Sequence, residues 1–169
     1  MRPSDRGGID LGFLLTCSNW SFDADLQIVH AYVKLEIDGE TLIDEPLCID
    51  VGLPALLLSV HEDVEPFRWA PADEWQRIPF FCCGCGDPEC RAFSFIVRHK
   101  ADRRLELTEV EEREGRSPRE LGTYDIDWSD YAKQVREIGE TFLRFVEHLD
   151  YRPYFKDTVE TVKRQLARG

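Results

Sequence analysis

Apolar and polar residues alternate along the first third of the chain, and this period of two predicts β-strands. Positions 9 to 17 carry an apolar residue at every second place, which is typical of a strand with one buried face. Positions 26 to 37 repeat the pattern. Asp38-Gly39 then predicts a two-residue hairpin turn, after which 41–47 returns as a third strand.

The middle of the chain adds strands of the same kind. We expect 77–83 and 92–99 to pair as a hairpin, and 103–112 and 121–128 to form two more strands. Counted with the first three, they give about seven strands joined mainly by short turns, which favours an antiparallel sheet.

A different spacing marks the helices. Between 129 and 149 apolar residues recur at steps of three and four, which predicts a long amphipathic helix. Short helices are expected at 53–60, where Pro54 lies in the first turn, and after Asp157. The pattern therefore predicts an α+β fold: one antiparallel sheet of about seven strands, covered by a long C-terminal amphipathic helix plus short helices, in a single domain over 1–169.

The net charge of the chain indicates which class of macromolecule it can bind. The chain of 169 residues has a net charge of -12, and residues 1 to 80 hold 5 Lys and Arg against 15 Asp and Glu. This acidic half would repel nucleic acid and attract a basic protein partner. No apolar run is long enough to cross a membrane and the N-terminus does not resemble a signal peptide, so we expect a cytoplasmic protein that binds neither nucleic acid nor membrane.

Four of the six cysteines lie between positions 82 and 90, at the predicted hairpin tip. The Cys82-x-x-Cys85-Gly86 spacing is typical of a zinc knuckle. Cys90 lies where the chain returns, so Cys82, Cys83, Cys85 and Cys90 are the candidate metal ligands and zinc is the candidate cofactor. Neighbouring residues on a strand point to opposite faces, so one of Cys82 and Cys83 joins the other two.

The fourth ligand is left open by the sequence. Candidates are the other cysteine of the 82/83 pair, or a side chain from elsewhere: His99, His61, Cys17 or Cys48. Two alternatives to a metal remain, namely reduced cysteines that form a compact turn, and redox or nucleophilic thiol chemistry.

Asp125 and Asp127 are two carboxylates on the same face of the predicted strand 121–128. Carboxylates at i and i+2 on a strand can bind a cation or act as acid and base. A helix cap and a solvated sheet face account for them equally well, and we favour that interpretation.

The turn also supports a resemblance. A strand, the Cys83, Cys85-Gly86 and Cys90 turn, a return strand and a Trp-containing strand entering a long helix resemble small uncharacterised bacterial α+β proteins that share this turn, over residues 80 to 149. The resemblance implies the fold and a metal-binding turn, and it implies no activity.

Two functional hypotheses follow. The first is a non-enzymatic interaction module that is stapled by zinc and uses its acidic half to bind a basic protein. The second is a metal- or thiol-dependent enzyme that uses the cysteines at 82–90. The sequence favours the first, and no catalytic residue is assigned.

Overall fold

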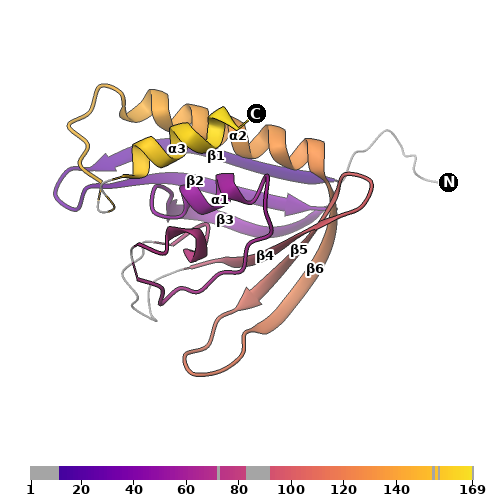
Figure 1. Cartoon of the computed structure of the whole chain (residues 1–169). Coiled ribbons are helices and arrows are strands. Elements are labelled where there is room, and N and C mark those ends of the chain that lie inside the picture. Colours follow the sequence, from indigo (N-terminus) through magenta and orange to yellow (C-terminus); the bar gives the residue numbers. More distant parts are fainter. Residues whose placement is uncertain (1–11, 72, 83–91, 154, 156, 169) are drawn as a thin grey trace.

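The structure is a computed structural model that describes residues 12–71, 73–82, 92–153, 155 and 157–168. It shows an α+β chain whose strands form two separate antiparallel sheets (Figure 1). The strands are β1 (Phe13–Asp23), β2 (Ile28–Ile37), β3 (Glu40–Cys48), β4 (Ser94–Lys100), β5 (Arg104–Glu111) and β6 (Arg119–Asp127). The helices are α1 (Leu53–Leu58), the 3-10 turn η1 (Trp75–Arg77), α2 (Trp128–Val146) and α3 (Thr158–Ala167).

The first sheet has the order β1-β2-β3. Strand β2 alternates strictly between buried and half-buried residues, as its sequence predicts. Asp38 and Gly39 both have positive φ, 51° and 86°, which is the geometry of the tight turn expected between β2 and β3. Strand β1 continues to Asp23, beyond the predicted end at position 17, past a register shift between Ser18 and Ser21.

The second sheet has the order β4-β5-β6. Asp102 and Arg103 form the turn between β4 and β5, and both have positive φ. On the outer edge of β4, Val64 forms an isolated bridge with Val97 through two backbone hydrogen bonds. This bridge occupies part of an edge at which another strand could pair.

The expected single antiparallel sheet of about seven strands, covered by a long C-terminal helix, is wrong. The described strands number six, in two three-stranded sheets, and the helices are separate elements of 6, 19 and 10 residues. The missing strand is 77–83, of which the described part holds one isolated bridge, Phe81 to Phe93. Pro79 has no N–H to donate to a ladder, which disfavours a strand at this place.

Packing also draws this segment away from the sheets. The backbone carbonyls of Pro79 and Phe80 lie so close to Gly52 that a Cβ at position 52 would collide with them. Gly52 immediately precedes α1. The 79–80 segment therefore packs on the N-terminus of α1 instead of extending β4.

Helix α2 lies where the two sheets meet. It starts directly after β6, with Asp127 as its N-cap accepting a hydrogen bond from the Asp130 N–H at 3.0 Å, and it contacts β1 and β6, an outer strand of each sheet. Helices α1 and α3 pack against α2 (Figure 1).

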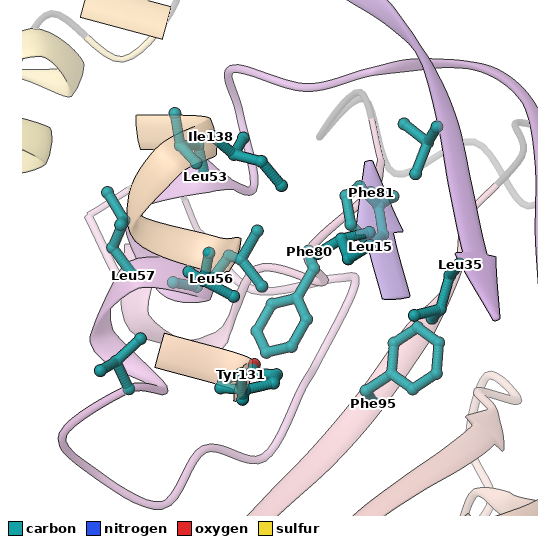
Figure 2. Packing of buried hydrophobic residues seen from close by; sticks show 14 of the residues in the cluster. Leu15, Leu35, Leu53, Leu56, Leu57, Phe80, Phe81, Phe95, Tyr131 and Ile138 are labelled. Atoms are coloured by element: carbon teal, nitrogen blue, oxygen red, sulfur yellow. The ribbon is translucent and has the colours of Figure 1, made fainter. Parts of the chain in front are cut away.

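Both sheets contribute to one hydrophobic core (Figure 2). Phe13, Leu15 and Leu35 of the first sheet share a lining with Phe95 and Leu107 of the second. Side chains of α1, α2 and the 80–81 segment fill the space between them: Leu56, Tyr131, Phe80 and Phe81. No helix in the described part of the chain has the length and apolar character needed to cross a membrane.

Candidate functional site

The cysteine-rich turn falls largely outside the described residues, which exclude Cys83, Cys85 and Cys90. Cys82 is described. Its side chain is 5% exposed, it packs against Val51 and Ile78, and its S–H donates to the carbonyl oxygen of Pro79 at 3.6 Å. The described environment of Cys82 is a small apolar cluster, and the zinc site stays a prediction.

The residues considered as a fourth ligand are spread over the fold. His99 Nε2 lies 2.9 Å from the carbonyl oxygen of Ser59, to which it donates. Cys17 lies in β1, where burial raises its pKa to about 12. Cys48 lies at the end of β3 beside His30, and His61 follows α1. Across the ranges that the structure describes, no three His, Cys, Asp or Glu side chains are arranged to hold a metal ion.

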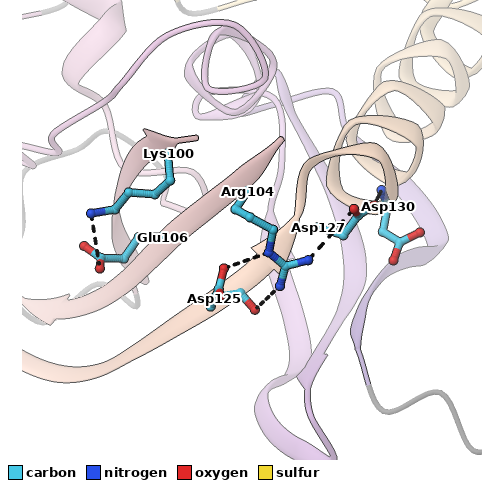
Figure 3. Close-up of polar contacts among 6 residues, drawn as sticks. All are labelled: Lys100, Arg104, Glu106, Asp125, Asp127 and Asp130. Carbon is cyan, nitrogen blue, oxygen red and sulfur yellow. Dashed lines mark hydrogen bonds and ion pairs between the residues drawn. The ribbon is translucent and has the colours of Figure 1, made fainter. Parts of the chain in front are cut away.

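Asp125 and Asp127 have structural partners (Figure 3). Arg104 Nε donates to Asp125 Oδ1 at 3.0 Å, and its Nη1 lies 3.9 Å from Asp127 Oδ1. Asp127 also caps α2. The expected helix cap is confirmed at Asp127, and Asp125 lies on an exposed sheet face where it pairs with Arg104.

A different pair of carboxylates lies where the two sheets approach each other. Glu40 is the first residue of β3, and Glu109 lies in β5. Tyr124 of β6 joins the sheets, since its hydroxyl donates to Glu40 Oε2 at 3.1 Å. We call Glu40, Glu109 and Tyr124 the acidic junction.

A glycine in strand β6 leaves room for the Tyr124 side chain. Gly122 is the cross-strand partner of Glu109, and a Cβ at Gly122 would lie 2.9 Å from the Tyr124 hydroxyl oxygen. The tyrosine ring therefore lies over the glycine, on the same face of the sheet, and its hydroxyl reaches across to Glu40.

The two carboxylates influence each other. Burial raises the pKa of Glu109, and the negative charge of Glu40 raises it further. Burial also raises the pKa of Tyr124, followed by its hydrogen bond to Glu40 and the charges of Glu40 and Glu109. Both pKa shifts have the direction expected for acidic groups that are partly buried and lie near other negative charges.

Three other carboxylates of the second sheet each form an ion pair with a Lys or Arg. Glu106 pairs with Lys100 at 3.7 Å, and Glu111 pairs with Arg119 at 2.9 Å, as Asp125 does with Arg104. Within the described chain, no Lys or Arg forms an ion pair with Glu40 or Glu109. The acidic junction therefore has capacity to bind a cationic group.

The sequence pattern does not point to any of the three residues of the acidic junction. Glu40 lies in the predicted hairpin, and Glu109 and Tyr124 lie in two predicted strands. The available signal was Gly122 inside a predicted strand, two positions before Tyr124, since an interior glycine often marks the close approach of another group. The glycine alone does not indicate which side chain approaches the strand.

Comparison of the chain with known protein families, curated proteins and solved structures found no match.

Proposed function

We propose that the protein is a non-enzymatic interaction module that binds a basic protein partner through the acidic junction. The observation that carries the proposal is the pair Glu40 and Glu109, drawn from two sheets and lacking a cation among the described side chains. A Lys or Arg of a partner would supply the missing charge and would find Tyr124 beside it as an aromatic neighbour.

The whole chain supports the same class of partner. Its net charge is -12, most of it in residues 1 to 80, so the long-range field favours approach of a basic surface. Zinc held by the 82–90 turn would act as a staple in this proposal and would take no part in binding the partner. A cytoplasmic location belongs to the same proposal, because reduced or metal-bound cysteines suit a reducing compartment.

The test compares two double variants that remove the same charge. Glu40→Gln with Glu109→Gln alters the acidic junction, whereas Glu106→Gln with Glu111→Gln removes two carboxylates that already have cationic partners. Affinity for a lysine-rich peptide is measured by calorimetric titration at about 50 mM and about 200 mM salt.

We expect wild-type affinity to fall with salt, and the junction variant to bind about fivefold to tenfold more weakly than wild type at low salt. The control variant should lose much less affinity for the peptide than the junction variant does. Equal losses in both variants would show that overall charge, and not the acidic junction, attracts the peptide. Binding that does not respond to salt would contradict the proposal as a whole.

The same pair of variants can identify a natural partner. Proteins from a cell extract that bind immobilised wild type and the control variant, but not the junction variant, are the expected partners. They should be basic in net charge.

A further inference from the structure

A thiol and an imidazole lie side by side on the first sheet, at the end away from the acidic junction. His30 of β2 and Cys48 of β3 are direct cross-strand partners, and His30 Nε2 lies 3.6 Å from Cys48 Sγ. This distance is within the range of a hydrogen bond that involves sulfur. Both side chains are half-buried.

The alternation of the strands produces this pair. Val29, Ala31 and Leu47 point into the core, so their neighbours His30 and Cys48 share the opposite face. The β2–β3 register fixes which residues meet. The Asp38-Gly39 turn pairs Ile37 with Glu40, and a register shift between Leu35 and Glu36 then brings Cys48 opposite His30. The pair is therefore held by backbone geometry and not by flexible loops.

A buried carboxyl group lies close to the pair. Asp50, two residues after Cys48, is 2% exposed; its Oδ2 accepts a hydrogen bond from the Tyr151 hydroxyl at 2.6 Å. The other oxygen, Oδ1, is buried and has no hydrogen-bond partner among the described residues. A positive charge on His30 acts on Asp50 and lowers its pKa, although burial, the larger influence, raises it.

The other described cysteines have different surroundings. Burial raises the pKa of Cys17 to about 12, which keeps that thiol protonated at neutral pH. The Cys82 S–H donates to the Pro79 carbonyl oxygen. Cys48, by contrast, faces a nitrogen base that can take its proton, and a thiolate is the nucleophilic form of cysteine.

We propose that Cys48 is a reactive thiol, activated by His30, that exchanges with low-molecular-weight disulfides. The Cys48 proton moves to His30 Nε2, and the thiolate attacks one sulfur of a disulfide RSSR. The S–S bond of RSSR breaks as a Cys48–S–S–R bond forms, and the leaving thiolate takes a proton to depart as RSH. Cys48 is oxidised to the mixed disulfide while the leaving sulfur is reduced.

Several titratable groups near the pair influence its pH dependence. Tyr32 and Asp44 lie next along the same face, joined by a hydrogen bond of 2.7 Å, and Lys34 and Glu36 follow as an ion pair. Asp50 and Tyr151 lie beyond the end of β3. On β1, the residue opposite His30 is Ser21, which does not titrate.

The test measures each group of cysteines separately in the intact chain. Trypsin cleavage after Lys and Arg places Cys17 in peptide 7–34, Cys48 in peptide 35–68 and the four turn cysteines in peptide 78–91. The folded protein is incubated with glutathione disulfide between about pH 6 and about pH 9, quenched with acid, digested and analysed by mass spectrometry.

We expect peptide 35–68 to gain one glutathione at least about tenfold faster than peptide 7–34 at pH 7. An ordinary thiol loses about tenfold in rate for each pH unit below its pKa, and we expect a shallower loss for Cys48. Labelling of Cys48 as slow as that of Cys17 would overturn the proposal. This comparison needs no variant.

Two variants then test the role of His30. His30→Gln keeps a polar side chain of similar reach but removes the base, and we expect the Cys48 rate at pH 7 to fall about tenfold. Tyr32→Phe, on the same strand and face, is the matched control and should leave the rate unchanged. An unchanged rate and pH profile in folded His30→Gln protein would refute activation by His30; slow Cys17 labelling verifies that the variant is folded.

Discussion

Asp50 is a carboxyl group whose environment favours its protonated form. Burial raises its pKa above the ordinary value of 3.8, while hydrogen bonds from Tyr151 and from the backbone of Val29 and Asp50, and then the charge of His30, oppose the shift. Because the folded pKa is the higher one, the stability that protonated Asp50 contributes is fully present below about pH 3.8 and is lost as pH rises through the folded pKa.

Asp50→Asn cannot ionise and keeps an oxygen that accepts from Tyr151. We therefore expect the variant to have a higher free energy of unfolding than wild type at pH 7, with the difference shrinking towards zero near about pH 3. Urea denaturation at several pH values measures it. Asp25→Asn, on an exposed residue, controls for the loss of one negative charge. A variant that is less stable than wild type at pH 7 would show that the hydrogen-bonded carboxylate outweighs its burial cost.

Gln134 lets helix α2 take the place of a strand at the edge of β1. Its Oε1 accepts from the Leu15 N–H at 2.7 Å, and its Nε2 donates to the Phe13 carbonyl oxygen at 2.8 Å. These are backbone groups that another strand would otherwise pair with. The side-chain amide thus ends the first sheet at β1 and helps to keep the two sheets separate.

Gln134→Ala removes both hydrogen bonds, so we expect a loss of about 1–3 kcal/mol in the free energy of unfolding. We also expect faster hydrogen exchange of the Leu15 amide in the folded variant. The exposed neighbour Lys133 provides a control, since Lys133→Ala should change stability by less than about 0.5 kcal/mol. Equal effects of the two substitutions would mean that solvent replaces Gln134 at no cost.

The elements that the sequence predicts well are those set by local periodicity. The β2–β3 hairpin with its Asp38-Gly39 turn follows from alternation and turn chemistry, and α2 begins one residue before the predicted 129 because Asp127 caps it. The prediction fails where distant packing decides. The described part of the strand expected at 77–83 packs on Gly52 instead, and the edge of β1 is covered by Gln134, which is 119 positions away from Leu15.

In the candidate site, too, local features could be predicted from the sequence and long-range contacts could not. The structural role of Asp127 could be predicted from its place before a helix, because capping is local. The acidic junction could not, since Glu40 and Tyr124 are 84 positions apart and meet through the docking of one sheet against the other. The His30 and Cys48 pair could not be predicted either, because the two-residue turn alone would place Leu47 opposite His30, and a register shift between Leu35 and Glu36 brings Cys48 there instead.

For the whole molecule, the shared core implies that the two sheets unfold together. Phe95 of β4 is 1% exposed, stacks on Phe80 at 6.3 Å between ring centroids, and lines the same buried space as Leu35 of the first sheet (Figure 2). Phe95→Ala should therefore cost about 3–5 kcal/mol and weaken both sheets, although Phe95 belongs to the second.

The measurement that tests this prediction is whether the two sheets unfold in a single cooperative transition. In wild type and in Phe95→Ala, unfolding followed by circular dichroism should coincide with hydrogen exchange of core amides in both sheets, such as those of Val33 and Val97. Leu121→Ala, on a β6 residue that is 49% exposed, should change stability by less than about 0.5 kcal/mol. If Phe95→Ala released Val97 while Val33 stayed protected, the second sheet would unfold independently. Docking between the sheets, on which the acidic junction depends, would then be a weak contact that opens without loss of the first sheet.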